Sequence, residues 1–593
     1  MKKKTASFTR RGFVRALARL TAFPTFGIPL FTFNGVATQA LAKSVWPTQA
    51  DWDSLRNEVK GRLIQVTSPL KACQINSGSS HCAEALEQMK NPFFLEGHPG
   101  ATQSTGWLQG WKTEVSPYAV AAESPADIVA AVNFVRKHGI KLVIKGTGHD
   151  YLGRSNAPDS LLVWTHKMRK ITVHEAFTPT GGNGPGVPAV TVEAGTRWLE
   201  AYDAVTNQHG RYVQGGGCTS VGVAGGFIQG GGFGSFSKKF GIAAASMLEA
   251  EVVTADGLVV LANEFQNKDL FWALKGGGGG TFGIVARLTL LTHELPENFG
   301  IVQGTIRASS DRDFQELLEA FADFYTQNLG NEHWGEQVKI KEDNSIDIAL
   351  VFQGLSKIEA QKVWQSFLAR LESRPQQYTV ETDFTVMPAS KMWDYGYMSN
   401  QYPHLVTLDK RKGQPSNQFW WTSNQGEVSR FQWSYQSRWL PLQLFKDTKR
   451  CAELFFRMSR HHSFSLHLNK GQAGATPTAL ERGQNTSINP AVFNATALII
   501  ANGRSDTEAY PDIEGHKPDL ELGREVLRRI NAAMKILRDA TPGAGSYSNE
   551  TDYHEPNWQE EFWGTNYPRL LAIKRKYDPQ GLFQTHHSVG SEL

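Results

Sequence analysis

The sequence predicts an α+β fold with two lobes, and three observations lead to it. The chain has 593 residues, more than one hydrophobic core usually organises. From about 112 to 300, short helices and strands alternate between long glycine-rich loops. From about 300 to 540, glycine thins out and longer helical stretches alternate with short strands. The last fifty residues are rich in Trp, Tyr and Asn, so we expect an ordered tail.

Local signals place individual elements within both lobes. Ser124 and Pro125 begin a helix that Gly139 ends, and residues 141–145 form a strand directly after it. Asp256-Gly257 is the strongest short hairpin signal and joins two strands. Hydrophobic periodicity predicts further strands at 161–164, 189–192 and 345–352, and helices at 197–208, 313–329, 357–371 and 524–538.

The first 42 residues predict an export signal. Three lysines and the pair Arg10-Arg11 precede an apolar stretch from about 20 to 36, and Ala40-Leu41-Ala42 gives a small-x-small cleavage site. The paired arginines resemble the signal read by the bacterial twin-arginine export machinery, so a periplasmic or secreted location is expected. The alternative is a membrane anchor, which the short, proline-interrupted stretch disfavours.

Charge and spacing exclude several function classes. The formal net charge is +4, but the predicted signal holds seven Lys and Arg residues and no acid, so the mature chain carries −3. No basic face is left to bind nucleic acid. No later segment is long and apolar enough to span a bilayer, and no set of side chains has convincing metal-ligand spacing.

The four cysteines have different expected roles. Cys73 and Cys82 lie nine residues apart and could close a local disulfide in an oxidising compartment, with two unrelated thiols as the alternative. Cys451 lies in a helical apolar run and is expected in the core. Cys218 lies among glycines, where it is either an inert small hydrophobe or a nucleophile.

Three glycine-rich loops are candidate binding elements. The first, 145–155, has glycines and hydroxyls that suit a pyrophosphate cradle, although a buried His such as His149, taken alone, is usually a structural hydrogen-bonder. The second, 215–234, has ten glycines in twenty residues, which fits backbone packed against a flat ligand. The third, 276–283, has dinucleotide-fingerprint spacing, but a helix-like segment precedes it and a strand follows, so a Rossmann NAD site is rejected.

In this order, the loops resemble the PCMH-type FAD-binding domain of the vanillyl-alcohol-oxidase superfamily. Together with the tail segments 563–567 and 576–579, they make the mature chain similar to berberine-bridge-enzyme-like oxidases, which include carbohydrate and alcohol oxidases. The resemblance implies a PCMH-type FAD domain plus a substrate domain whose antiparallel sheet is backed by helices. The expected units are the signal 1–42, an N-terminal segment 43–111, the FAD domain 112–300, the substrate domain 301–544, and a segment 545–593 that returns to the FAD domain.

The resemblance also implies covalent FAD. His149 stands at the family's attachment point for the flavin 8α-methyl, and Cys218 at the C6 attachment point of bicovalent members. Many members have only the histidyl link, so one bond and two both stay open. Val221 stands where a small side chain accompanies oxygen reactivity. The residues expected to contact FAD are Lys145, Gly146, Thr147, Gly148, His149, Asp150, Gly153, Arg154, Ser155, Gly217, Cys218, Val221, Gly222, Gly225, Gly226, Gly232, Gly234, Val253 and Asn566.

Tyr547 is the candidate catalytic base, by resemblance to the family's Tyr-x-Asn motif. It would take the substrate hydroxyl proton while hydride passes to flavin N5; a role as cavity wall is the alternative. Phe240 stands where some members have a second tyrosine, which puts a two-tyrosine base in doubt. Four tryptophans could stack on substrate rings, with core positions favoured for most: Trp420, Trp421, Trp433 and Trp439.

The expected activity is oxidation of a small alcohol or carbohydrate, with O2 as acceptor and hydrogen peroxide as product. Two alternatives remain. One is a dehydrogenase with another acceptor, against which Val221 argues mildly. The other is an exported binding protein without turnover, which would have no need for both His149 and Cys218.

Overall fold

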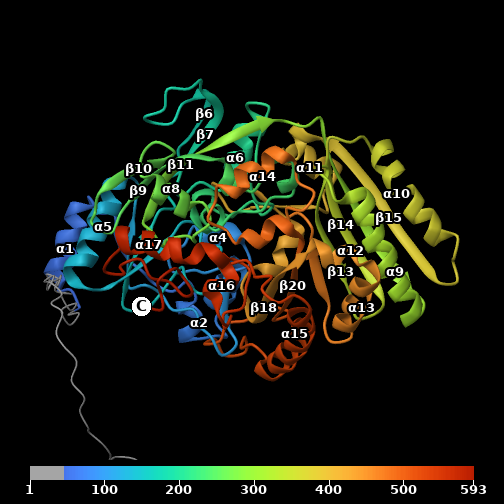
Figure 1. The fold of residues 1–593 in the computed structure, drawn as a ribbon. Coiled ribbons are helices and arrows are strands. Elements are labelled where there is room, and N and C mark those ends of the chain that lie inside the picture. The colour runs from blue at the N-terminus through green and yellow to red at the C-terminus, as the bar shows by residue number, and fades with distance from the viewer. Residues whose placement is uncertain (1–45) are drawn as a thin grey trace, which may run out of the picture. The chain divides into compact units, whose positions relative to one another are not determined.

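The computed structural model describes residues 46–593 (Figure 1). The predicted export signal at 1–42 lies outside the described residues. Within 46–593, no helix is both long and apolar enough to cross a membrane.

The N-terminal part of the described chain forms a four-stranded sheet. Its strand order is β1 (Leu63–Gln65), β3 (Tyr118–Ala121), β5 (Ser160–Trp164), β4 (Lys141–Lys145). The last three strands are parallel, and β1 is antiparallel to β3. Helix α5 (Pro125–His138) connects β3 to β4. A capping box of Ser124 and Asp127 begins it, and Gly139, at φ +63°, ends it, as the sequence predicts.

A second, antiparallel sheet continues this half. Its order is β10 (Val259–Asn263), β9 (Met247–Val253), β11 (Ile284–Glu294), β7 (Val187–Glu193), β6 (Ile171–Phe177), with β8 (Arg211–Val213) also on β11. Helix α8 (Lys268–Leu274) packs with helix α17 (Tyr567–Tyr577) of the C-terminal segment in one apolar cluster. The tail therefore lies against this half of the molecule.

An eight-stranded sheet forms the other half. Its order is β15 (Tyr378–Pro388), β12 (Asn298–Ala308), β14 (Ser345–Gln353), β13 (Trp334–Ile340), β19 (Phe464–His467), β20 (Ala495–Arg504), β18 (Arg430–Pro441), β2 (Ser104–Trp107). All neighbours are antiparallel except β18 and β2.

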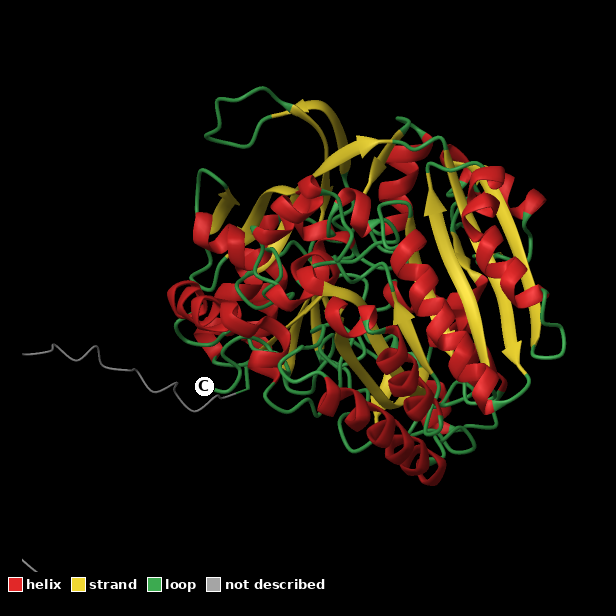
Figure 2. Ribbon diagram, turned by 45° about the vertical axis from the view of Figure 1, so that its right-hand side comes forward, coloured by secondary structure: helices red, strands yellow, loops and turns green. Residues whose placement is uncertain are grey.

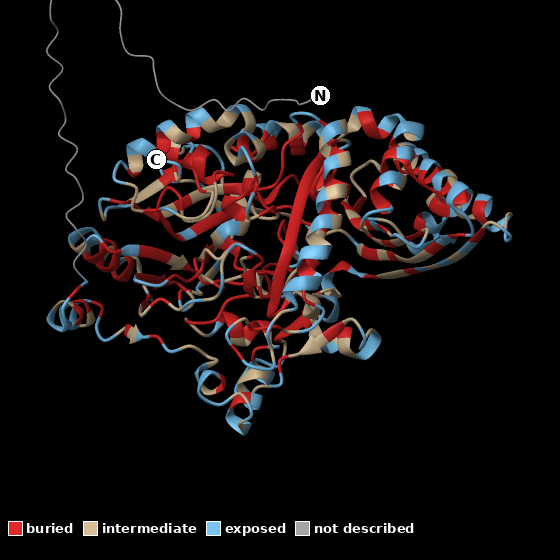
Figure 3. Cartoon of the chain, turned by 90° about the horizontal axis from the view of Figure 1, so that it is seen from below, coloured by how far each residue is buried: buried red, intermediate tan, exposed pale blue. Residues whose placement is uncertain are grey.

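Helices cover one face of this sheet (Figure 2). They are α9 (Asp311–Phe324), α10 (Lys357–Glu372), α13 (Thr448–Ser459) and α15 (Leu520–Ala540). Alternate strand residues such as Ile348, Leu350 and Phe352 pack against them in the largest core cluster. Figure 3 shows the result, with central strands buried and the covering helices buried along one side only. The opposite face of the sheet is left to line a cavity.

Shorter elements complete the description. The helices are α1 (Gln49–Glu58), α2 (Lys71–Ile75), α3 (Ser80–Gln88), α4 (Pro92–Glu96), α6 (Trp198–Tyr202), α7 (Ser237–Phe240), α11 (Tyr395–Gln401), α12 (Leu442–Lys446), α14 (Pro477–Gln484) and α16 (Trp558–Trp563), and the strands β16 (Val406–Leu408) and β17 (Phe419–Trp421) form a small hairpin.

The expected α+β fold, with an antiparallel sheet backed by helices, is confirmed. Two elements differ: the predicted helix 197–208 is α6 followed by a π-helical turn at 203–207, and the predicted helix 313–329 is α9 followed by a π-helical turn at 325–329. The disulfide between Cys73 and Cys82 is present, and Cys451 is buried in α13 as expected. The boundaries at 111, 300 and 544 stay predictions.

Candidate functional site

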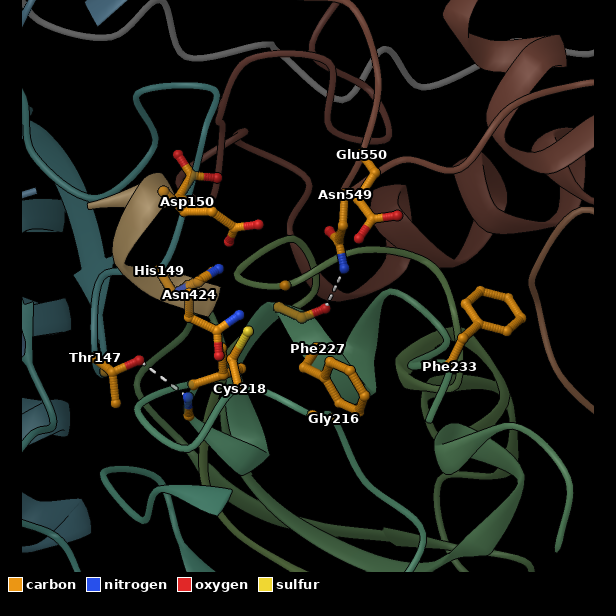
Figure 4. Close-up of a pocket in the computed structure, with 18 of the residues that line it drawn as sticks. Thr147, His149, Asp150, Gly216, Cys218, Phe227, Phe233, Asn424, Asn549 and Glu550 are labelled. Atoms are coloured by element: carbon orange, nitrogen blue, oxygen red, sulfur yellow. Dashed lines mark hydrogen bonds between the residues drawn. The ribbon is translucent and has the colours of Figure 1, made fainter. Parts of the chain in front are cut away.

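A cavity of about 770 Å³ lies between the glycine loops and the uncovered face of the eight-stranded sheet. All three loops contribute to its lining, and so do β12, β13, β14 and the segment that contains Tyr547. The volume is within the range of cofactor and ligand sites. Figure 4 shows residues of the first two loops at the cavity together with Asn424 and the C-terminal residues Asn549 and Glu550.

The first loop follows the carboxyl end of β4, one of the parallel strands, where such sheets place ligands. Buried Lys145 donates to the carbonyls of His98 (2.8 Å) and Ala101 (2.7 Å), which fixes the start of the loop, and burial lowers the pKa of Lys145 to about 7. Asp150 accepts from both the backbone N–H and the guanidinium of Arg154, at 2.7 Å each. The loop is therefore rigidly closed on itself.

The second and third loops are held against the first and against each other. The N–H of Gly222 donates to Thr147 Oγ1 at 3.0 Å (Figure 4). A Cβ on Gly279 would lie 2.8 Å from the Cα of Gly226, so only glycine allows this approach. By contrast, a Cβ on Gly217 or Gly225 would meet nothing within 4 Å. These two glycines open onto the cavity.

His149 and Cys218 project into the same cavity from different loops (Figure 4). Burial lowers the pKa of His149, so its imidazole is neutral at neutral pH. Its Nδ1 is buried without a hydrogen-bond partner, whereas Nε2 lies 3.5 Å from Tyr151 Oη. Cys218 is a free thiol, and burial, with Glu427 next, raises its pKa well above the usual range. Both attachment candidates are thus free to form a bond.

These residues fit FAD. Nδ1 of His149 and Oγ of Ser155 are buried atoms that lack partners in the described protein, and such groups are normally satisfied by a ligand or water. Gly217 and Gly225 leave space for a flat ring, and the 145–155 loop has the glycines and hydroxyls of a pyrophosphate cradle. Among residues 46–593, no group of three or more potential ligands could hold a metal ion.

Tyr547 faces the cavity from the C-terminal segment. Asn549 Nδ2 donates to Tyr547 Oη (3.1 Å) and to the carbonyl of Gly226 (2.8 Å; Figure 4). Lys470 Nζ lies 5.9 Å from the centre of the Tyr547 ring and forms an ion pair with Glu550. Burial, and secondarily Glu550, raises the pKa of Tyr547, which is a neutral phenol at rest. Asn549 and Lys470 are the partners that the sequence did not identify.

The structure brings most of the predicted site residues together. Those that line the cavity are Lys145, Gly146, Thr147, Gly148, His149, Asp150, Arg154, Ser155, Gly217, Cys218, Val221, Gly222, Gly225, Gly226 and Tyr547. Trp421 also lines it and donates to the Gly217 carbonyl at 2.9 Å, whereas Trp420, Trp433 and Trp439 are buried in the core. Phe240 is buried against Tyr212 and lies off the cavity lining.

Five predicted contacts lie behind the lining rather than on it: Gly153, Gly232, Gly234, Val253 and Asn566. The three glycines allow close packing under Trp111, Phe227 and the Gly215 carbonyl, respectively. Val253 pairs with Ile284 in the second sheet, and Asn566 donates to the carbonyl of Ile488 at 2.8 Å. Their contact with FAD stays a prediction.

Sequence reasoning missed the polar and apolar residues that line the cavity outside the glycine loops. They are Glu336, Gln337, His467, Lys470, Glu427 and Glu550, together with apolar positions of β12, β14 and β15. Each is a single polar or apolar side chain without a surrounding sequence motif that marks it. Only Glu550 was signalled at all, by its place three residues after Tyr547 in the tail motif.

The chain is similar to known flavoproteins along most of its length. Residues 116–263 match the model of the FAD binding domain, and residues 546–590 match the berberine and berberine-like model. The VAO-type flavoprotein oxidase VAO615 of Thermothelomyces thermophilus is 29% identical, with 93% of this chain and 92% of that protein covered. An FAD-linked oxidoreductase of Arthroderma benhamiae is 30% identical, with 93% of each chain covered.

Solved structures agree with the fold. The VAO-type flavoprotein MtVAO615 from Myceliophthora thermophila C1 has a TM-score of 0.74 at 27% identity, covering 92% of this chain and 96% of that one. Glucooligosaccharide oxidase from Acremonium strictum has a TM-score of 0.63 at 20% identity, covering 88% and 99%. That enzyme carries a 6-S-cysteinyl, 8α-N1-histidyl FAD.

Proposed function

Because the chain belongs to the berberine-bridge-enzyme-like, VAO-type FAD-linked oxidoreductases, we propose that it is an oxidase acting on a small alcohol or carbohydrate. The observation that carries the proposal is one cavity that joins the loops of His149 and Cys218 to Tyr547. When bound, FAD would supply the hydride acceptor, and O2 would take the two electrons, with hydrogen peroxide as product. The chain's own residues hold the cofactor and move the proton.

His149 Nδ1 and Cys218 Sγ would carry the two covalent bonds. The proposal is supported by the unpartnered Nδ1 and the free thiol facing the same cavity. Glucooligosaccharide oxidase, which shares the fold, has the same pair of bond types. A tether at two points prevents loss of FAD outside the cell, where the free cofactor is scarce.

Tyr547 would take the proton of the substrate hydroxyl. Because burial raises its pKa, the phenol needs neighbours that stabilise negative charge on Oη. The Asn549 amide donates a hydrogen bond to Oη, and the Lys470 ammonium lies near the Tyr547 ring. Lys470 also pairs with Glu550, which reduces the repulsion between the Glu550 carboxylate and a negative charge on Oη. This arrangement suits a base that is charged only during the reaction.

Val221 supports O2 rather than another acceptor. It lines the cavity three residues after Cys218, at the position where a small side chain accompanies oxygen reactivity in similar proteins. We expect Val221→Leu to slow reoxidation by O2 without changing the rate of reduction by substrate, measured separately in rapid-mixing experiments. Equal reoxidation rates in both proteins would show that Val221 does not control oxygen reactivity, and slow reoxidation of the wild type by O2 would favour the dehydrogenase alternative.

Acid precipitation of the purified holoprotein tests the attachment. For the wild type, the yellow colour is expected to stay in the protein pellet. It should also stay in the pellet of each single variant, His149→Ala and Cys218→Ala, because one covalent bond remains. In the double variant it should move into the supernatant. Cys451→Ala and His462→Ala are matched controls away from the cavity and should behave as wild type. Colour in the wild-type supernatant would contradict covalent FAD but leave an FAD enzyme. An oxygen-electrode screen of alcohols and sugars tests the oxidase activity directly.

We also propose that the protein is exported. The disulfide between Cys73 and Cys82 supports an oxidising compartment. The relatives named above are fungal, so they lend no support to a bacterial periplasm or to the twin-arginine route. Sequencing the N-terminus of protein recovered outside the expressing cells should give a start near Lys43; an intact Met1 there would contradict signal cleavage.

A further inference from the structure

Glu336 has a backbone conformation that is unusual for a strand. It lies inside β13 with φ at +67°, in the left-handed region that non-glycine residues rarely adopt. Successive side chains of a strand normally point to opposite faces, yet Glu336 and Gln337 both line the cavity. The cross-strand partner of Glu336 is Leu350, which packs into the helix-covered core. The left-handed residue therefore turns a carboxyl group away from that core and toward the cavity.

The surroundings hold β13 in this position. A Cβ on Gly335 would lie 1.7 Å from the carbonyl oxygen of Ser235, so the strand is pressed against the end of the second glycine loop. The hydroxyl of Ser235 donates to the Glu336 carboxyl, and the carbonyl of Glu336 accepts from Leu468 N–H at 2.8 Å. Strained residues that the fold constrains in this way cluster at functional sites.

The carboxyl of Glu336 is only partly satisfied. Burial raises its pKa, and Lys470, whose positive charge opposes this rise, is already paired with Glu550. Within residues 46–593, Glu336 has one side-chain hydrogen bond, from Ser235, and no ion pair. A half-buried carboxyl group that lines a cavity and still has lone pairs without a partner favours a ligand that donates a hydrogen bond.

The sheet beside Glu336 changes from polar to apolar across its strands. Gln337 pairs with His467 on one side and with Ala349 on the other. Further along, Val351 pairs with Ile301, and Met387 belongs to the outer strand β15. All of these residues line the cavity. The side chains of Ala349, Val351, Ile301 and Met387, here called the apolar wall, offer no hydrogen bond to a sugar.

Resting on the proposed oxidase function, we propose that Glu336 is a specificity-determining residue that accepts a hydrogen bond from a hydroxyl or ammonium group of the substrate, while the apolar wall holds a hydrophobic ring. The substrate class is then a ring-bearing, amphipathic alcohol rather than a free sugar. A sugar would leave hydroxyl groups unpaired against the apolar wall, which costs binding.

The test measures binding by the change in flavin absorbance of the oxygen-free holoprotein. The probes are 2-phenylethanol, 2-phenylethylamine, the methyl ether of 2-phenylethanol, which lacks a donor, and D-glucose. At least one of the two donor probes should bind tenfold or more tightly than the ether, and both more tightly than glucose. The better of the two identifies the donor, hydroxyl or ammonium, that Glu336 accepts.

Glu336→Gly removes the carboxyl and suits the positive φ, so the fold should be kept, as checked by melting temperature and flavin content. In this variant the preference over the ether should disappear. Ile301→Thr should weaken the binding of the three phenyl probes and leave the binding of glucose unchanged. Glu332→Gln is the matched control, since Glu332 pairs with Lys239 away from the cavity lining, and it should bind every probe as wild type does.

A donor preference that survives in Glu336→Gly, or glucose binding tighter than the phenyl probes, would overturn the inference. Oxygen uptake is recorded separately with the same probes. Discriminating binding without any oxygen uptake would contradict the oxidase proposal and leave the role of Glu336 standing. Oxygen uptake without discrimination would contradict the role of Glu336 alone.

Discussion

The two sides of the cavity are built in different ways. On the flavin side, the lining comes from three continuous loops that approach through glycine backbone and leave polar atoms such as His149 Nδ1 and Ser155 Oγ without protein partners. On the sheet side, single residues from separate strands stand on a closely packed helix-covered core. The difference indicates that the first side needs a ligand to satisfy its polar atoms, whereas the second gives the cavity its shape and, through the partly satisfied Glu336, its selectivity.

The largest expected effect comes from a side chain that fills the open space beside Gly217 on the flavin side of the cavity. Gly217→Leu places a side chain in space where no protein atom lies within 4 Å, so we expect loss of bound flavin with an unchanged fold. Gly184→Leu is the matched control, because Gly184 is exposed, also has nothing within 4 Å and does not line the cavity. Flavin absorbance per protein and circular dichroism check both variants. Normal flavin content in Gly217→Leu would show that the ring does not lie over this glycine.

A smaller effect is expected where the two sides meet. Tyr547→Phe removes the proposed proton acceptor but keeps the ring, so flavin reduction by substrate should slow by about 10² to 10⁴-fold at normal flavin content. Tyr553→Phe is the control, because that tyrosine stacks on His586 and lies off the cavity lining. Anaerobic stopped-flow absorbance measures the rate. A reduction rate close to wild type would assign Tyr547 to the cavity wall.

A substitution in the core beneath the sheet side should change the stability of the protein rather than its flavin content. Trp364 is fully buried in α10 against Phe324 and Phe384, and Trp364→Ala should lower the free energy of unfolding by about 3–5 kcal/mol. Urea denaturation measures the loss, and flavin content is measured below the transition. Loss of flavin from folded Trp364→Ala would contradict the view that the core beneath the sheet side affects stability but not flavin binding.

The smallest effect concerns the contact between the C-terminal segment and α15. Burial raises the pKa of Glu555 from 4.5 to about 7, despite Arg538 nearby. The folded state therefore holds this proton more tightly than the unfolded state, and the stabilisation present below pH 4.5 is lost as pH rises through 7. The loss amounts to about 3 kcal/mol.

Glu555→Gln cannot ionise and should not show this dependence. Its melting temperature relative to wild type should therefore rise between pH 5 and pH 8. Glu525→Gln is the control, because that carboxylate lies on the exposed side of α15 and pairs with Arg528. A constant difference between wild type and Glu555→Gln across this range would show that Glu555 is ionised throughout.

Much of the flavin side could be predicted because its signals are local. The helix between Ser124 and Gly139, the strand at 141–145 and the hairpin at Asp256-Gly257 all appear as expected. Most predicted residues of the first two loops line one cavity. Loop glycines and caps act on their immediate neighbours in the chain, so their effect can be read along the sequence.

The sheet side could not be predicted in the same way. Nothing in the residues around 336 marks a left-handed strand position, because Ser235 and Leu468, which hold it there, lie more than a hundred residues away along the chain, one before it and one after it. Lys470 meets Glu550 and Tyr547 only because β19 lies beside β13 while the tail returns to the cavity. Five positions expected to contact FAD are not on the cavity lining, and their contact with FAD stays a prediction.

The amino-acid sequence by itself determined the fold class, the family resemblance and the loops able to hold FAD, since these depend on glycine spacing, caps and hydrophobic period. Only the tertiary structure decided which carboxyl faces the cavity, which cation neighbours Tyr547 and which strands form the apolar wall. The physical reason is that backbone conformation is set mostly by near neighbours, whereas the position of a side chain in a shared cavity depends on the register of strands far apart in the chain.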